Sequence, residues 1–197
     1  MSPSAPPLIL ASTSVYRRAL LERLQLPFGC VAPEVDEAAQ ENESPEALVR
    51  RLSLAKAQAV ASAHPDAVII GGDQVAVGPD QRVLGKPGTV ERACAQLSRQ
   101  SGQVVRFLSG LCVLDAARGS HELAIVTTTV RFRVLDDAAI RRYVARDQPL
   151  DCAGALRSEA LGITLCEAID SDDPTALMGL PLIRLAAMLR GAGYALP

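Results

Sequence analysis

Aromatic residues are scarce in this 197-residue sequence, which holds three Tyr, three Phe and no Trp. Proteins that stack several bases of a nucleic-acid strand need aromatic platforms, so the composition argues against that class. Apolar residues nevertheless make up 49% of the chain, which is ordinary for a globular protein. We therefore expect a folded protein whose core consists mainly of Leu, Val, Ile and Ala.

An excess of charge of one sign is also lacking. The 20 Lys and Arg nearly balance the 22 Asp and Glu, which leaves a net charge of −2. No overall positive field would attract nucleic acid or an acidic membrane. The apolar run 8–11 is far too short to span a bilayer, and the residues before it do not resemble a signal peptide. We expect neither nucleic acid nor membrane as a partner.

The sequence has only two His, and its five Cys include no C-x-x-C pair. A metal site built from Cys and His is therefore not indicated. An odd number of scattered Cys is typical of reduced thiols, so we expect a cytoplasmic protein. We also expect all five to be small buried side chains: Cys30, Cys94, Cys112, Cys152 and Cys166.

Three common phosphate or acyl-transfer motifs are missing. The string nearest to a Walker A loop, 78–87, has badly spaced glycines and Pro87 where Ser or Thr would bind magnesium. The sequence contains neither the G-x-G-x-x-G of dinucleotide folds nor the G-x-S-x-G of serine hydrolases.

Helical and strand patterns alternate along the chain, which predicts an α/β fold with a mixed β-sheet flanked by helices. We expect Gly71-Gly72-Asp73 to close the third strand, with extended chain over 74–77 and a turn over 78–81. A flexible tail over 1–7 would precede a single domain over 8–197. The expected strands are 8–11, 28–32, 67–70, 104–114, 123–134 and 163–169, and the expected helices are 15–24, 45–63, 89–98, 136–146 and 182–190.

The junction between the first strand and the first helix has the features of an anion site. A helix N-terminus offers free backbone N–H groups, and Ser12 and Ser14 add hydroxyl groups. Arg17 and Arg18 follow in the first turn, where cations oppose the helix dipole unless an anion offsets them. A capped surface helix with two solvated arginines explains the pattern equally well.

Two acids and two lysines lie at breaks or on small-residue faces. Asp73 follows a strongly apolar strand, Glu37 lies in a loop, Lys56 interrupts an alanine-rich stretch and Lys86 lies between Gly and Pro. Oxygen ligands and lysines suit a polyphosphate carried with Mg²⁺ or Mn²⁺. Each residue also has a plain alternative as a cap, a turn acid or a surface lysine.

Read together, the motifs resemble the Maf family of nucleoside triphosphate pyrophosphatases. They are L-A-S-T-S-x-x-R-R, P-E-V-D-E, R-L-x-x-x-K-A, G-x-D-Q-V, G-K-P, A-G and G-L-P, in order from about residue 8 to residue 191. The resemblance implies an α/β fold with two lobes around a deep cleft. It also implies a divalent metal and hydrolysis of a nucleoside triphosphate to the monophosphate and pyrophosphate, and dimers are common in the family.

The resemblance assigns roles to the residues that match the motifs. Glu37 and Asp73 would hold the metal, and Asp73 would also act as the catalytic base. The positions that contact phosphate in the family correspond to Ser12, Arg17, Lys56 and Lys86. These roles agree with the chemistry, because water attack on the α-phosphorus needs a base and neutralisation of the leaving pyrophosphate.

Further marks are G-G-D-Q-V over 71–75, C-A-G-A-L-R-S-E over 152–159, D-P-T over 173–175 and G-L-P-L-I over 179–183. They resemble the subgroup that hydrolyses 7-methyl-GTP, in which the base-recognition positions correspond to Tyr16, Gln74 and Glu159. Methylated guanine carries a positive charge, which an aromatic face attracts, and its paired N–H donors suit a carboxylate. The plain alternatives are a rim tyrosine, a residue that supports Asp73 and a surface acid. The alternative substrates are dTTP, UTP or another modified nucleotide. A regulator of septum formation is the alternative that is not an enzyme.

Overall fold

A computed structural model describes residues 5–197 of the chain. Four residues of the tail expected over 1–7 therefore lie outside the described residues. A seven-stranded sheet has the order β2-β1-β3-β5-β6-β7, and the short β4 pairs with β3. Parallel pairs (β1 with β2 and β3) and antiparallel pairs (β3 with β4, β6 with β7) make the sheet mixed, as predicted.

The helices that flank the sheet confirm the α/β expectation. Over the described residues the strands are β1 (Leu8–Ala11), β2 (Gly29–Val31), β3 (Val68–Val77), β4 (Val83–Leu84), β5 (Val104–Asp115), β6 (Ser120–Phe132) and β7 (Cys166–Ser171). The α-helices are α1 (Val15–Glu22), α2 (Pro45–Ala61), α3 (Val90–Gln100), α4 (Asp137–Asp147) and α5 (Leu182–Gly191). Short 3₁₀ turns cover η1 (Ala153–Ala155), η2 (Leu161–Leu165) and η3 (Ala176–Met178).

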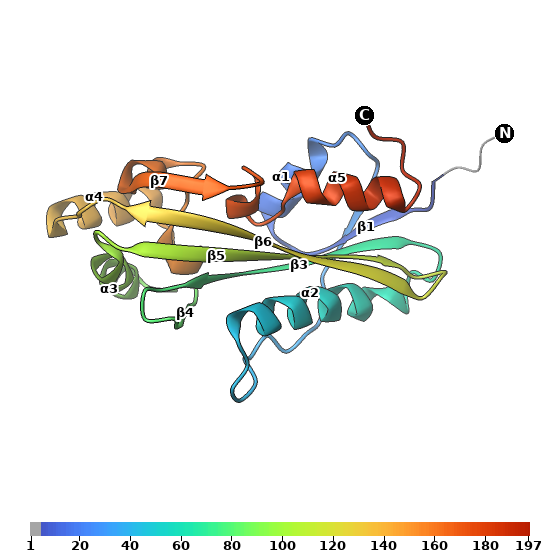
Figure 1. Ribbon diagram of the computed structural model, residues 1–197, viewed down its shortest axis with the longest axis horizontal. Helices are drawn as coiled ribbons and strands as arrows, with labels where there is room; N and C mark the ends of the chain where they lie inside the picture. The colour runs from blue at the N-terminus through green and yellow to red at the C-terminus, as the bar shows by residue number, and fades with distance from the viewer. Residues whose placement is uncertain (1–4) are drawn as a thin grey trace. The chain divides into compact units, whose positions relative to one another are not determined.

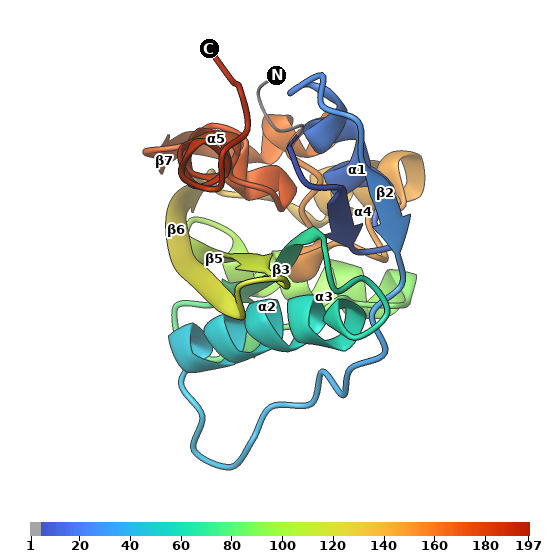
Figure 2. The same cartoon turned by 90° about the vertical axis from the view of Figure 1, so that its right-hand side faces the viewer.

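The chain divides into two compact units. The first contains the described residues up to Asp73 together with Ser109–Val126 and Asp173–Pro197. In this unit α2 covers one face of the strands, and α1 and α5 cover the other (Figures 1 and 2). The alternation of side chains along β1 produces these layers, because Leu8 and Leu10 pack with α1 and α5 while Ile9 and Ala11 pack with α2.

Two glycines let α2 lie close to the strands. A Cβ atom on Gly71 would lie 2.2 Å from the backbone oxygen of Ser53, and one on Gly110 would lie 2.4 Å from Ser53 Oγ. Both distances are shorter than any allowed contact. Side chains at these two positions would therefore push α2 away from β3 and β5.

The second unit contains Gln74–Leu108 and Thr127–Asp172. It holds α3, α4 and the 3₁₀ turns η1 and η2, which contact one another. Buried polar groups stabilise the turn at η1: Gln100 Nε2 donates to Gly154 O at 3.0 Å, and the hydroxyl of Tyr143 donates to Ala155 O at 3.2 Å. Burial raises the pKa of Tyr143, so this hydroxyl remains a donor at neutral pH.

The structure corrects three expectations. β3 does not close at Gly71-Gly72-Asp73 but continues to Val77, so Asp73 is a strand residue. The last strand begins at Cys166 rather than residue 163, because 161–165 forms a 3₁₀ turn. All five Cys are free as expected, but Cys112 alone among them is buried and Cys30 is exposed. Within residues 5–197, no helix is both long and apolar enough to cross a membrane.

Candidate active site

Hydroxyl groups cap the junction between β1 and α1. β1 ends at Ala11, and Ser14 is the N-cap of α1, where its Oγ accepts a hydrogen bond from Arg17 N at 3.4 Å. The buried Ser12 Oγ accepts another from Ser14 N at 3.1 Å. The first turn of α1 has no acidic residue, so it offers the positive end of its dipole without a compensating carboxylate of its own.

The two arginines of this turn have different surroundings. Arg17 Nε donates to Gly179 O at 2.9 Å. Desolvation lowers the pKa of the Arg17 guanidinium, and the nearby carboxylates of Asp73 and Glu37 oppose that effect. Arg18 instead forms an exposed ion pair one turn along α1, at 3.1 Å. Arg17 therefore lies close enough to the two acids to feel their charge, whereas Arg18 matches the alternative of a solvated surface arginine.

A buried lysine joins two carboxylates. Lys56 Nζ lies 2.7 Å from Asp73 Oδ1 and 2.6 Å from Glu37 Oε1. The Lys56 side chain is 7% exposed and that of Asp73 10%, while Glu37 reaches in from a loop with 59% of its side chain exposed. A buried ammonium is tolerated because both its neighbours carry the opposite charge. The structure thus brings Glu37, Lys56 and Asp73 to one point.

The backbone of Asp73 is also held by α2. Asp73 N donates to Ser53 Oγ at 3.1 Å, and Ser53 Oγ donates to Val49 O at 2.7 Å. Ser53 is completely buried and lies one helical turn before Lys56. Two residues on one face of α2 therefore bond to Asp73, Ser53 at its backbone N–H and Lys56 at its carboxylate. Sequence reasoning missed Ser53, although a polar residue on an apolar helical face three positions before Lys56 was an available signal.

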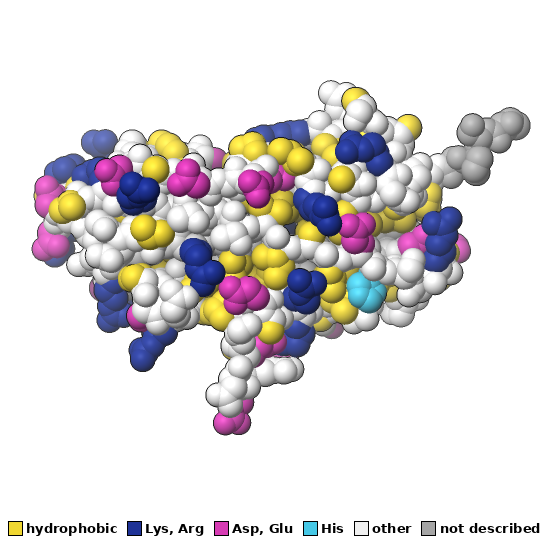
Figure 3. All heavy atoms as spheres, in the orientation of Figure 1, with side chains coloured by type: hydrophobic (Ala, Val, Ile, Leu, Met, Phe, Trp, Pro, Cys, Tyr) yellow, Lys and Arg dark blue, Asp and Glu magenta, His cyan; other side chains and the backbone are white. Residues whose placement is uncertain are grey.

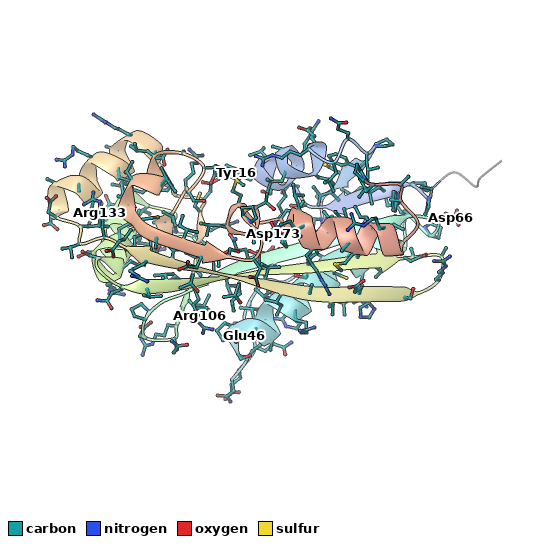
Figure 4. All side chains as sticks on the ribbon, turned by 45° about the horizontal axis from the view of Figure 1, so that its top comes forward. Tyr16, Glu46, Asp66, Arg106, Arg133 and Asp173 are labelled. Carbon is teal, nitrogen blue, oxygen red and sulfur yellow. The ribbon has the colours of Figure 1, made fainter. Side chains whose placement is uncertain are left out.

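The segment that contacts Arg17 is organised by a buried aspartate. Asp173, only 2% exposed, accepts hydrogen bonds from Thr175 N at 3.0 Å and Ile183 N at 2.7 Å. These bonds fix the turn before α5, and Figure 4 labels Asp173 there and Tyr16 on α1. Gly179 lies in this turn with φ at +102°, a conformation that favours glycine. The D-P-T and G-L-P strings thus have a structural role that the sequence did not reveal.

Three further residues of the predicted site lie in the second unit. Gln74 follows Asp73 in β3 and is partly buried, Lys86 is exposed between β4 and α3, and Glu159 is exposed between η1 and η2. The grouping around Lys56 therefore contains Glu37, Asp73 and Arg17, all from the first unit. The roles of Gln74, Lys86 and Glu159 stay predictions.

Glu37 and Asp73 are the residues that could hold a divalent metal. Both direct a carboxylate oxygen at one cationic centre, which the Lys56 ammonium provides in the structure. Two carboxylates, completed by water and substrate phosphates, form the kind of donor set that binds Mg²⁺. Residues 5–197 contain no cluster of three or more His, Cys, Asp and Glu with the arrangement of a metal site. The pair fits a metal that arrives with its substrate better than one caged by protein.

Comparison with known proteins places this chain in a family. Residues 7–192 match the family described as Maf-like protein. The chain is 53% identical to a 7-methyl-GTP pyrophosphatase of Aromatoleum aromaticum over 96% of this chain and 97% of that protein. It is 51% identical to one of Pseudomonas aeruginosa (98% and 100%) and 54% identical to one of Xanthomonas axonopodis pv. citri (98% and 100%). This chain therefore belongs to the Maf family.

Proposed function

We propose that this protein is a nucleoside triphosphate pyrophosphatase that hydrolyses 7-methyl-GTP to 7-methyl-GMP and pyrophosphate. The observation that carries the substrate is the similarity to proteins of that name, about half identical over nearly their whole length. The paired carboxylates around Lys56 are compatible with the reaction, because water attack on a phosphorus atom needs a base and nearby cations.

Asp73 is the proposed base. A water molecule attacks the α-phosphorus, the bond from that phosphorus to the oxygen bridging to the β-phosphorus breaks, and pyrophosphate leaves. The proton of the attacking water passes to the Asp73 carboxylate. Lys56 holds this carboxylate and Ser53 holds the backbone of the same residue, so little reorganisation accompanies the proton transfer.

Cationic groups of the chain bind the triphosphate. We assign Arg17, Lys56 and Lys86 to this role, with Ser12 as a hydroxyl contact. Arg17 is already oriented by Gly179 O, which leaves its terminal guanidinium nitrogens as donors toward phosphate oxygens. A divalent ion, Mg²⁺ or Mn²⁺, held by Glu37 and Asp73 would supply further neutralisation of the phosphate charge.

Base recognition is assigned to Tyr16, Gln74 and Glu159. The tyrosine ring offers a negative face to the positively charged methylated guanine. The carboxylate of Glu159 accepts hydrogen bonds from the paired N–H donors of that base, and it cannot donate to a pyrimidine carbonyl while ionised. Gln74 directly follows the proposed base in β3, and its side-chain amide can both donate and accept hydrogen bonds.

The experiment is a panel of 7-methyl-GTP, GTP, dTTP and UTP, tested with Mg²⁺ and with Mn²⁺, in which monophosphate and pyrophosphate are both quantified. We expect the highest kcat/KM on 7-methyl-GTP. Asp73→Asn should lower kcat at least about 100-fold, because it removes the base. Asp66→Asn, an exposed acid just before β3, is the matched control and should leave kcat unchanged.

Three results would contradict the proposal. Release of orthophosphate alone would exclude the assigned bond cleavage. Equal kcat/KM for all four nucleotides, or a preference for dTTP or UTP, would reject the substrate. Near wild-type turnover by Asp73→Asn would reject Asp73 as the base.

We further propose that the protein acts in the cytoplasm as a homodimer. The five free thiols suit a reducing compartment, and dimers are common in the family that the sequence resembles. Size-exclusion chromatography with light scattering would measure the mass directly, and a monomer at the enzyme concentrations used in the assay would reject the dimer.

A further inference from the structure

The proposed metal ligand Glu37 lies on a segment without helix or strand. Residues 32–44 connect β2 to α2 and extend along the outer side of α2 (Figure 2). Most of these residues are exposed, including Glu37 itself. Ordering such a segment costs conformational entropy, so the short contact between Glu37 and Lys56 needs other contacts that hold the loop.

Arg51 of α2 supplies those contacts. Its Nε lies 2.7 Å from Glu43 Oε1, and its Nη2 lies 2.8 Å from Glu43 Oε2, so the ion pair is bidentate. The same Nη2 donates to Ala38 O at 3.0 Å. Glu43 Oε2 also accepts a hydrogen bond from Gln40 N at 3.0 Å.

These bonds fix the loop on the C-terminal side of Glu37. Ala38 is the next residue in the chain, so a hydrogen bond to its carbonyl restricts the positions that the Glu37 backbone can take. Glu43 lies just before α2, and its contacts with Arg51 and Gln40 close residues 38–43 into a loop fastened to α2.

We propose that Arg51 is a positioning residue that holds Glu37 beside Lys56 and Asp73 through Ala38 and Glu43. The metal-binding part of this inference rests on the proposed function. Arg51 touches no reacting atom; it acts by limiting the positions that the Glu37 carboxylate can take. We call the contacts of Arg51 with Ala38 O and Glu43 the Arg51 clamp. Without this clamp, we expect Glu37 and Asp73 to bind metal more weakly.

A plain surface ion pair is the alternative, and its geometry would differ. The Arg18 pair on α1 makes one contact, between side chains that are both more than half exposed at 64% and 54%. The Glu43 side chain is only 8% exposed and that of Arg51 28%, and their contact uses the planar fork of the guanidinium. Lysine keeps the charge at this position but cannot reproduce three directed bonds.

The experiment compares Arg51→Lys with wild type in three measurements. The first is the affinity for Mn²⁺ without nucleotide, by electron paramagnetic resonance. The second is the Mn²⁺ concentration that gives half-maximal turnover, and the third is hydrogen exchange of the amides of 36–43. We expect the Mn²⁺ dissociation constant and the Mn²⁺ concentration for half-maximal turnover each to rise about tenfold. Hydrogen exchange of the amides of 36–43 should accelerate. Arg118→Lys, at an exposed arginine that pairs with Asp115, is the matched control and should change none of them.

A charge-exchanged double variant separates the two contacts of the Arg51 clamp, the ion pair with Glu43 and the hydrogen bond to Ala38 O. Glu43→Arg combined with Arg51→Glu restores an ion pair but removes the donor to Ala38 O. We expect it to recover thermal stability relative to Arg51→Ala while Mn²⁺ affinity stays low. Recovery of Mn²⁺ affinity by this double variant would show that the pair alone suffices and would overturn the role of the Ala38 contact.

Other results decide between the inference and the proposed function. If Arg51→Lys loses stability but keeps wild-type Mn²⁺ affinity and exchange, Arg51 is only structural and the inference is wrong. If the wild-type protein does not hydrolyse 7-methyl-GTP but Arg51→Lys still weakens Mn²⁺ binding and loosens 36–43, the function fails and the positioning role holds.

Discussion

At the scale of single residues, the site depends on supporting hydrogen-bond partners as well as on the charged side chains themselves. Ser53 accepts the backbone N–H of Asp73 at 3.1 Å, and Gly179 accepts Arg17 Nε at 2.9 Å. Both supports are far from their partners in sequence. Composition and spacing therefore identified the charged residues, whereas their orientation depends on tertiary contacts that no local pattern encodes. The same limit explains why the local pattern could not decide between an anion site and a capped helix with solvated arginines, whereas Arg17 and Arg18 differ in the structure.

Ser53→Ala tests this support. The substitution leaves the buried N–H of Asp73 without its acceptor, which costs about 1–3 kcal/mol of stability. Because the carboxylate of Asp73 also loses its fixed backbone, we expect kcat to fall more than KM rises. Urea unfolding and steady-state kinetics measure the two effects.

Ser62→Ala is the control for Ser53→Ala, since Ser62 is an exposed residue at the C-terminal end of the same helix. It should change neither measurement. If Ser53→Ala lost stability while retaining wild-type kcat, Ser53 would support the fold but not the position of the proposed base.

At the scale of elements, local sequence predicted the helices well because their capping residues are explicit. Ser14, Ser44, Thr89 and Asp136 each accept a hydrogen bond from the first turn of a helix, as capping chemistry predicts. The strands were harder. Gly71 and Gly72 suggested a break, but these glycines accommodate close neighbours within a continuous strand. Glycine is required at these positions because α2 and β5 approach β3 closely, and a short sequence window around 71–72 contains neither element.

Gly110→Ala should disturb the contact between β5 and α2. The new methyl group would lie 2.4 Å from both Ser53 Oγ and Val49 Cγ1, so α2 must shift and the core must repack. Overpacking of this kind costs about 1–3 kcal/mol, measured by urea unfolding. A displaced Ser53 also loosens Asp73, so turnover should fall in the folded variant.

Gly29→Ala provides the comparison for Gly110→Ala, because a Cβ at position 29 of β2 meets nothing within 4 Å. Its stability should stay within about 0.5 kcal/mol of wild type. Equal effects of the two substitutions would mean that the approach of α2 does not require glycine at position 110.

At the scale of the whole molecule, alternating helices and strands predicted the mixed α/β architecture, and the ordered motifs predicted the family. Composition alone could not place Glu37, because a loop residue acquires its position from contacts such as that with Lys56. Charge balance, in contrast, is a property of the complete chain that the sequence states directly. The net charge is −2, and on the face in Figure 3 basic and acidic side chains are interspersed.

This charge distribution predicts that the protein binds RNA only weakly. Extended RNA binding requires many phosphate contacts, and a protein with 6–10 of them loses about 10³–10⁵ in affinity between 50 and 200 mM salt. The described site offers a small group of cations, enough for one triphosphate. We therefore expect uncapped RNA, added in excess over the enzyme, to change kcat/KM for 7-methyl-GTP by less than about twofold at 50 mM KCl. Inhibition that disappears at 200 mM KCl would instead reveal an RNA-binding surface, and the free nucleotide would no longer be the sole ligand that the charge pattern supports.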